Sequence, residues 1–336
     1  MAELKKMVKD DINFLEYPNW TISRNSKTTV FTIQKPHGKY EVYCPLGLPK
    51  QFDKIVVYFL LYKLYHEKKF ASYTLKTNRY EIAQGILGGS HFSKSTYDRI
   101  MKSIKKWQTV SINFEGVFYE EEGHTIRGFA IVDEYILRKK TGELTIRFSE
   151  EYIKQLQDTK FYKLIDFEQY KRLHKTSSAR LYEILVKNFK DRHEWAINIQ
   201  SLAEKLTFEK REGAQNYFPS EVLRYLKPGI NEINKKTDLS IKFDYNNDTG
   251  VCIFKKITKL ASPNTKEVYA AAIKTESKRK QKDADNTKQI ALCMKQFKSL
   301  PIEEQEKILS AISQNPFLKV LDQDSQIFAY MMNNQQ

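Results

Sequence analysis

The sequence has 336 residues, of which 41% are hydrophobic, and its 56 basic and 41 acidic residues give a net charge of +15. This length favours two domains, and no apolar run approaches the roughly 18 residues that a membrane-spanning helix needs. The excess of positive charge favours a polyanionic partner, with nucleic acid ahead of an anionic membrane surface.

The first predicted elements begin near residue 46. Apolar residues recur there at intervals of three and four, which predicts a helix. They are Phe52, Ile55, Val56, Phe59, Leu60 and Leu64. A strand, two helices and three further β-type segments are predicted next, at 71–75, 79–87, 93–108, 110–114, 126–137 and 144–148.

The same order of elements recurs from residue 177. A helix, a strand, a short helix, a longer helix and a hairpin are predicted at 177–189, 195–199, 201–206, 219–235 and 239–257. The hairpin alternates apolar and polar residues, and the run NNDTG at 246–250 predicts its turn.

Both patterns read helix, strand, helix, helix, hairpin, which is the order of a winged helix. We therefore predict an α+β chain with two tandem winged-helix domains, each a helix-turn-helix plus a β-hairpin wing, and a helical C-terminal tail. Ser149 is the predicted cap of a connector helix between the two domains. The predicted segments are an N-terminal extension at 1–44, a first winged-helix domain at 45–148, a connector helix and second winged-helix domain at 149–258, a charged linker at 259–287 and a helical tail at 288–336.

Residues 88–95, GGSHFSKS, differ by one residue from a phosphate-binding P-loop, because Ser93 occupies the position of the second glycine. Residues 129–134, FAIVDE, look like the apolar strand and acid that hold magnesium in nucleotide-hydrolysing enzymes. A P-loop follows a buried strand, whereas the residues before Gly88 read as a short helix. We interpret the stretch as the turn and the start of a third helix, and we expect no nucleotide hydrolysis.

This third helix carries polar and basic residues mainly off its apolar stripe. Because a helix N-terminus holds phosphate with its backbone N–H groups, these residues are candidate contacts to DNA phosphates. They are Lys94, Ser95, Arg99, Lys102 and Lys106. The alternative is an ordinary solvated helix face, and the repeated fold favours DNA contact over it.

The corresponding loop, helix and wing of the second domain supply a second set of candidate DNA contacts. They are Lys210, Arg211, Asn216, Ser220, Arg224, Lys227, Asn246 and Asn247. Because the start of such a helix enters the groove, Asn216, Ser220 and Arg224 are the predicted base readers. For Asn246 and Asn247, at the wing tip, a structural role in a tight turn is an equally good interpretation.

Three residues in the second half of this helix have other predicted effects. Pro228 lacks a backbone N–H, so it should break the hydrogen-bond ladder and bend the helix. Glu232 and Asn234 are interpreted as structural, either as caps or as links to the hairpin.

Several motifs are characteristic of one family. The second domain contains SARLYEIL at 178–185, LRYLKPGINEIN at 223–234, and Thr237-Asp238. The first domain contains STYDRI at 95–100, KKWQTV at 105–110 and GFAIVDEY at 128–135. Over residues 45–257 the chain resembles plasmid replication initiator proteins, and its first domain resembles the subfamily called replication initiator protein A.

The resemblance implies a protein that binds repeated double-stranded origin sequences, called iterons, helps to open the origin and recruits host replication proteins such as a helicase or initiator. It implies that dimers repress the initiator's own gene, whereas monomers start replication. It also implies that the first domain carries the dimer contacts and that the second reads the major groove. Two alternatives remain open, a winged-helix transcriptional regulator without a replication role and a nucleotide-driven or nicking enzyme.

No residue pattern indicates an enzyme, a metal site or a cofactor. The six histidines include no pair at i, i+2 or i, i+4, which disfavours the metal site that a nicking enzyme needs. Cys44, Cys252 and Cys293 form neither zinc spacing nor a disulfide framework, which favours a reducing cytoplasm. We therefore expect a cytoplasmic, non-enzymatic DNA-binding protein that uses no cofactor and contacts no membrane.

Overall fold

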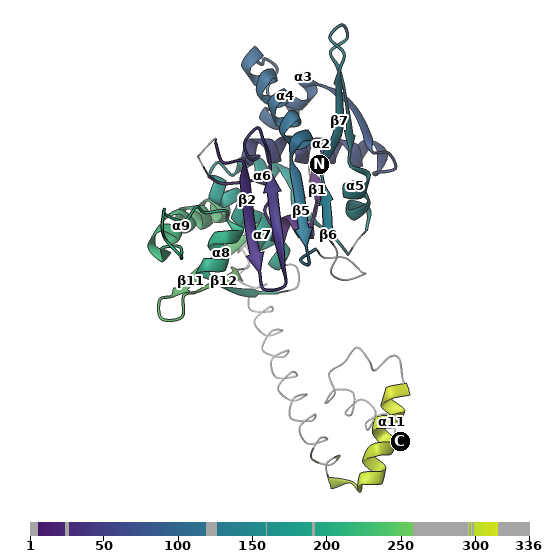
Figure 1. Cartoon of the computed structure of the whole chain (residues 1–336), viewed down its shortest axis with the longest axis vertical. Coiled ribbons are helices and arrows are strands. Elements are labelled where there is room, and N and C mark those ends of the chain that lie inside the picture. Colours follow the sequence, from purple (N-terminus) through teal and green to yellow (C-terminus); the bar gives the residue numbers. More distant parts are fainter. Residues whose placement is uncertain are drawn as a thin grey trace, which may run out of the picture. The chain divides into compact units, whose positions relative to one another are not determined.

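The structure is a computed structural model that describes residues 6–23, 27–118, 126–158, 160–189, 192–257, 295, 297 and 299–314. The chain divides into two compact units, Met1–Lys259 and Leu260–Gln336. All the elements of both predicted winged helices lie in the first of these units (Figure 1).

The first winged helix consists of three helices and a three-stranded antiparallel sheet. Its elements are α2 (Gln51–Lys68), β4 (Thr74–Asn78), α3 (Arg79–Leu87), α4 (Lys94–Thr109), β7 (Val132–Leu137) and β8 (Glu143–Phe148). The sheet has the order β4-β8-β7, so the strand after α2 pairs with the second strand of the hairpin. The helix predicted at 93–108 is α4, and its apolar stripe of Ile100, Ile104 and Trp107 is fully buried.

The second winged helix has the same plan. Its elements are α7 (Thr176–Asn188), β10 (Glu194–Asn198), α8 (Ile199–Lys205), α9 (Pro219–Lys236), β11 (Ser240–Asn246) and β12 (Val251–Ile257). The sheet order is β10-β12-β11, so the strand after the first helix again pairs with the second strand of the hairpin. Two copies of one topology confirm the predicted tandem winged helices.

An additional four-stranded sheet distinguishes the first winged helix from the second. Between α4 and β7 the chain forms two further strands, which join two strands from residues 30–43 in the order β2-β3-β5-β6. These strands are β2 (Val30–Lys35), β3 (Gly38–Tyr43), β5 (Ser111–Glu115) and β6 (Ile126–Phe129). The hairpin β2–β3 and the neighbouring β5 lie side by side in Figure 1.

Residues 7–43, which the sequence sets apart as an N-terminal extension, contribute to two sheets and to the core. Besides β2 and β3, they form β1 (Met7–Asp11), which pairs with β9 (Tyr162–Asp166), and α1 (Ile12–Glu16). Phe14, Trp20 and Tyr40 are at most 2% exposed. This segment therefore belongs to the folded body of the first unit.

The connector between the winged helices contains α5 (Glu150–Gln157), β9 and α6 (Phe167–Arg172). Ser149 occupies the N-cap position of α5 as predicted, but its side chain makes no capping hydrogen bond, so only the position of the cap is confirmed. Glu150 and Glu151 lie in the first turn, where a negative charge stabilises the helix dipole.

A buried polar network joins the two winged helices. The carboxylate of Glu183 on α7 lies 2.7 Å from Arg180 Nη1 and accepts a hydrogen bond of 3.0 Å from the indole N–H of Trp20. The hydroxyl group of Tyr58 on α2 lies 3.2 Å from the same carboxylate. Because a buried charge is stable only when it is paired and hydrogen-bonded, this network fixes α2 and the N-terminal segment against α7.

The second compact unit contains α11 (Ile302–Gln314), in agreement with the predicted helical tail. The linker predicted at 259–287, and residues 288–294 and 315–336 of the predicted tail, lie outside the described residues. None of the helices in the described part of the chain is long and apolar enough to cross a membrane.

Candidate nucleic-acid interface

The stretch that differs by one residue from a P-loop forms a helix end, a turn and a helix start. Gly88 and Gly89 have φ angles of 73° and 80°, a region that favours glycine. The Ser93 hydroxyl group accepts a hydrogen bond of 3.3 Å from the Thr96 N–H and so caps α4. The preceding element is the helix α3, as predicted, and not the buried strand on which a P-loop depends.

The start of α4 presents an exposed polar face, on which the structure brings together four of the five predicted residues. They are Lys94, Ser95, Arg99 and Lys102. The guanidinium group of Arg99 lies 3.6 Å from the ring centroid of Phe52 at the start of α2, which limits its rotamers.

Lys106 does not belong to this face, which corrects the prediction. Its side chain is buried, with Nζ 3.1 Å from Asp53 Oδ2 and donating to the Leu48 carbonyl oxygen at 3.3 Å. The physical reason is that α2 packs against the second half of α4, where Trp107 also donates to the Asp53 carbonyl oxygen at 2.7 Å. Lys106 therefore stabilises the helix pair and is not available to DNA.

Apart from those of the wing, the predicted contact residues of the second winged helix lie on the first half of α9 and on the loop before it. Asn216, Ser220, Arg224 and Lys227 are all exposed. The guanidinium group of Arg224 lies 5.2 Å from the ring centroid of Tyr225, which is itself 42% exposed.

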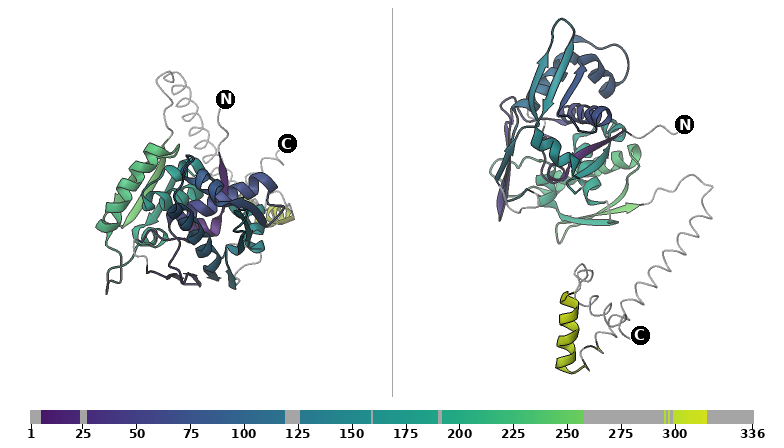
Figure 2. Two further views of the ribbon diagram at one scale, coloured as in Figure 1. Left: turned by 90° about the horizontal axis from the view of Figure 1, so that it is seen from above. Right: turned by 90° about the vertical axis from the view of Figure 1, so that its right-hand side faces the viewer.

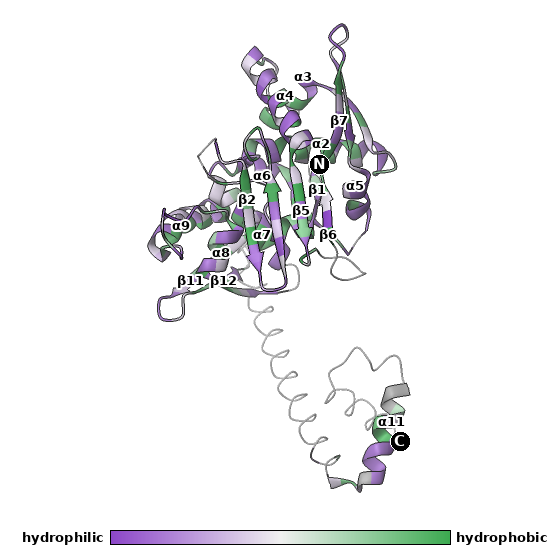
Figure 3. Cartoon of the chain, in the orientation of Figure 1, coloured by the Kyte–Doolittle hydropathy of each residue, from purple (hydrophilic) through white to green (hydrophobic). Residues whose placement is uncertain are grey.

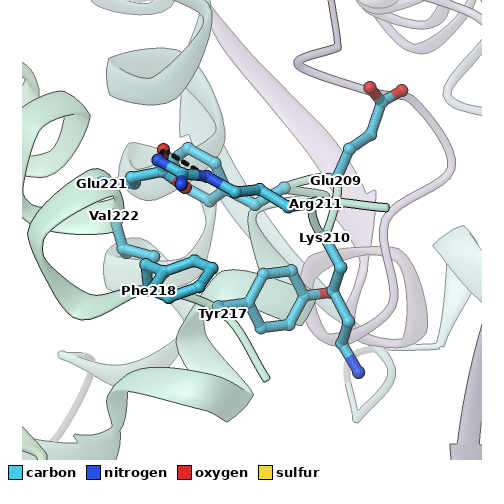
Figure 4. A pocket seen from close by; sticks show the side chains of 8 residues that line it. Glu209, Lys210, Arg211, Tyr217, Phe218, Glu221 and Val222 are labelled. Carbon is cyan, nitrogen blue, oxygen red and sulfur yellow. Dashed lines mark hydrogen bonds and ion pairs between the residues drawn. The ribbon is translucent and has the colours of Figure 1, made fainter. Parts of the chain in front are cut away.

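Of the two basic residues on the loop before α9, Lys210 and Arg211, the second forms an ion pair with Glu221. Arg211 Nε donates to Glu221 Oε1 at 3.0 Å, and the guanidinium group lies 4.7 Å from the Phe218 ring centroid. Lys210 extends away from this pair in Figure 4, with Nζ 5.2 Å from the ring centroid of Tyr217. In the free protein, Arg211 is thus held on the first turn of α9 by a carboxylate.

The second half of α9 is fixed to α7 by Glu232. This carboxylate accepts hydrogen bonds from the N–H groups of His174 and Lys175, both at 3.0 Å, and from the Ser178 hydroxyl group at 2.6 Å. Burial would raise its pKa, but these bonds and the one from Lys236 lower the pKa to about 2. The predicted structural role of Glu232 is confirmed.

Two further residues of α9 complete this support. Asn234 exchanges two hydrogen bonds with the Ile241 backbone, at 2.9 and 2.7 Å, and links α9 to the wing as predicted. At Gly229 the helix packs closely on α7, since a Cβ there would lie 3.4 Å from Ser177 Oγ, an ordinary van der Waals contact. The helix continues through Pro228 to its end at Lys236, so the proline does not terminate it.

At the tip of the second wing, the structure supports the turn interpretation for Asn246. Its Oδ1 accepts hydrogen bonds from the N–H groups of Asp248 and Thr249, at 2.9 and 3.1 Å. Asn247 is exposed. The turn contains no basic residue.

The first wing carries a basic tip that the sequence-based prediction missed. Arg138, Lys139 and Lys140 are consecutive and exposed where β7 ends, and Arg138 lies 3.1 Å from Glu143. The hairpin projects beyond the neighbouring helices (Figures 1 and 2), and its tip is hydrophilic (Figure 3). The available signal was three adjacent basic residues followed by a Thr-Gly turn.

A cleft of about 850 Å³ lies between the N-terminal segment, the start of α7 and the start of α9. Its walls include the basic residues Lys50, Lys175 and Arg224 and the acidic residues Glu209 and Glu221. Burial, followed by the charge of nearby Lys106, lowers the pKa of Lys50. Among the described residues, no group of three or more His, Cys, Asp or Glu side chains is placed to hold a metal ion.

The model of one protein family matches the first winged helix, the connector and most of α7. Residues 43–186 match the model of the family described as "Initiator Replication protein, WH1". Over these residues the match confirms the predicted resemblance to replication initiators, whereas the motifs at 223–234 and 237–238 lie outside it. No curated protein matches the chain.

Among solved structures, the Pi initiator protein in complex with iteron DNA is similar, with a TM-score of 0.50 and 16% identity over 77% of this chain and 100% of that chain. Domains 2 and 3 of RctB give a TM-score of 0.48 and 13% identity over 74% of this chain and 98% of that chain. The likeness to the Pi initiator protein concerns the fold, and it agrees with the tandem winged helices described above.

Proposed function

We propose that this protein is a plasmid replication initiator that binds iterons, repeated double-stranded DNA sequences at an origin. The observation that carries the proposal is the same helix-turn-helix formed twice, each time with the start of its third helix exposed and polar. The initiator match over residues 43–186, the net charge of +15 and the shared fold with the Pi initiator protein, solved in complex with iteron DNA, support it.

The two helices are proposed to bind DNA in different ways. On α4, Lys94 and Lys102 neutralise backbone phosphates, which contributes affinity without sequence preference. Arg224 on α9 donates two hydrogen bonds to a guanine edge, and Asn216 on the loop before it pairs with an adenine edge, because their donor and acceptor groups match those bases in the major groove.

The cleft is the proposed path of the DNA backbone between α9 and α4. Lys50 and Lys175 line it, and Lys50 lies two residues before Phe52, on which Arg99 of α4 stacks. Basic groups therefore continue from the start of α9 to the face of α4. A strand that follows this path engages both winged helices, and one chain then covers about two helical turns, roughly 20 bp.

The biological role follows from the family resemblance. We propose that DNA-bound protein promotes opening of the origin, recruits a host helicase or initiator, and represses its own gene as a dimer. It is proposed to act in the cytoplasm and to catalyse no reaction. A transcriptional regulator on the same fold would bind similar repeats without supporting replication.

Footprinting on DNA that flanks the gene tests the proposal. We expect protected direct repeats, and we expect the protected segment together with this protein to sustain replication of a plasmid that lacks another origin. Protection without replication would favour the transcriptional regulator. ATP hydrolysis or strand cleavage by the purified protein would favour an enzyme instead.

Arg224→Ala tests the assignment of the reading helix. If Arg224 contacts a base, the variant should lose about 1–3 kcal/mol of specific binding and discriminate less at one position of the repeat. Lys227→Ala, a change on the same helix, should weaken binding to all sequences equally. Unchanged specific affinity of Arg224→Ala would show that this face of α9 does not read DNA.

A further inference from the structure

The reading helix α9 begins at an exposed aromatic residue. Phe218 occupies its N-cap position, is 45% exposed and makes no capping hydrogen bond. Ser, Thr, Asp and Asn are preferred there because their side chains bond to the free N–H groups, as Ser93 does on α4. Every other phenylalanine of the described residues is buried or half-buried. Phe218 is therefore an exposed aromatic residue at a position that favours a capping side chain, a departure from local preference that occurs at functional sites.

The surroundings hold the ring of Phe218 in place without covering it. The guanidinium group of Arg211 lies 4.7 Å from the ring centroid of Phe218. It is itself held by an ion pair with Glu221 on the first turn of α9 (Figure 4). Pro219 occupies the first turn of the helix, where its fixed φ angle restricts the backbone next to Phe218. The ring is thus positioned before any partner binds.

The neighbours of the ring indicate a nucleic-acid partner for it. Lys210, Asn216 and Ser220 are polar and exposed on the same loop and first turn, so the exposed ring of Phe218 lies among the candidate DNA-binding side chains. In the major groove the one apolar feature of a base edge is the 5-methyl group of thymine, and apolar side chains contact it.

We propose that Phe218 recognises the 5-methyl group of a thymine and is a specificity-determining residue of this protein. The inference rests on the proposed function, because it requires the start of α9 to lie in the major groove. Phe218 would select thymine, whereas the proposed hydrogen bonds of Arg224 and Asn216 select guanine and adenine.

Replacing thymine by deoxyuridine removes the methyl group and leaves base pairing and hydrogen-bonding edges unchanged. The probes are duplexes of the footprinted repeat in which each thymine in turn is replaced by deoxyuridine, titrated with the full-length chain. At one or two positions the wild-type protein should lose about fourfold in affinity, which is the contribution of one buried methyl group.

Two variants separate recognition from folding. Phe218→Ser should bind the unmodified repeat more weakly and lose nothing further with deoxyuridine, while its melting temperature stays equal or rises because serine caps the helix. Phe218→Leu should keep the sensitivity to deoxyuridine. Leu164→Ser, which removes a similarly exposed apolar side chain from β9 (47% exposed), should behave as the wild type.

The inference is overturned if no deoxyuridine position weakens the wild-type protein, or if Phe218→Ser retains the wild-type pattern of losses. In both cases the protein still binds its repeat and the proposed function stands. A wild-type protein that protects no DNA in the footprint would instead refute the proposed function and this inference together.

Discussion

The buried carboxylate of Glu183 is the shared partner of several parts of the first unit, and Glu183→Ala tests whether the two winged helices fold as one. Glu183 accepts hydrogen bonds from the indole of Trp20 at 3.0 Å and from the hydroxyl group of Tyr170 at 2.8 Å, and it pairs with Arg180 at 2.7 Å. The side chains of Glu183 and Arg180 are both 0% exposed. The variant therefore leaves a buried guanidinium group without its carboxylate.

The magnitude follows from this unpaired charge. Removing one member of a buried ion pair typically costs about 3–5 kcal/mol, and each orphaned buried donor costs about 1–3 kcal/mol. Arg180 keeps its hydrogen bonds to the carbonyl oxygens of Phe14 and Leu15, at 2.9 and 3.1 Å, which moderates the loss. We expect the free energy of unfolding to fall by about 4 kcal/mol, a large share of the ~5–15 kcal/mol of a typical domain.

Urea unfolding followed by tryptophan fluorescence measures this loss. Trp20, Trp107 and Trp195 report on the N-terminal segment, the first winged helix and the second winged helix. The control is Glu194→Ala, which breaks an exposed ion pair of 2.8 Å with Lys255 and should cost at most about 1 kcal/mol. If Glu183→Ala costs no more than this control, the network does not hold the two winged helices together.

Four further variants test other sites. Burial raises the pKa of Asp11 to about 7 and leaves Oδ2 without a hydrogen bond. The folded state therefore loses stability as pH rises from about 4 to 7, and Asp11→Asn should raise the urea midpoint at pH 8 but hardly at pH 4. Lys102→Gln should lower the slope of log affinity against log salt by about 1, whereas Lys106→Met should lower only the urea midpoint. Replacing Lys139 and Lys140 by Gln should lower the slope by about 2, measured by anisotropy on any duplex, and an unchanged slope would show that the first wing does not reach DNA.

The order of elements was predictable because each is encoded by local spacing of apolar residues. The partners of residues 7–43 were not, because strand pairing is non-local. β1 pairs with β9, so that Val8 faces Ile165 across more than 150 residues of chain. No pattern within either strand specifies such a partner, and the segment therefore resembled an extension.

In the candidate site, too, non-local contacts decide what the local sequence pattern cannot predict, here for single residues. Lys102 and Lys106 are of one type and four residues apart, a step that turns a helix by only about 40°. They differ because the start of α2 covers the second half of α4, which brings Asp53 within 3.1 Å of Lys106. Periodicity predicted which side of α4 is apolar but not how far along it the neighbouring helix extends.

The motifs that carry the family resemblance also have a physical explanation. In the run RLYE, Arg180 and Glu183 form a buried ion pair, and in the run PGINEIN, Glu232 and Asn234 hold α9 against α7 and the wing. The contacts of these residues position the helix α9. These motif residues identify the fold, whereas Arg224, in the same run LRYLKPGINEIN, is the proposed base reader.

The two winged helices expose different side chains, and we expect them to contact different parts of the DNA. The first has lysines on α4 and a basic wing tip, which suit phosphates and carry no sequence information. The second has Phe218, Arg224 and Asn216 around the start of α9 and a wing tip without basic residues, which suits base edges. Substitutions confined to residues 216–224 should therefore change the preferred repeat, while the salt dependence of binding, which depends mainly on the first winged helix, stays the same.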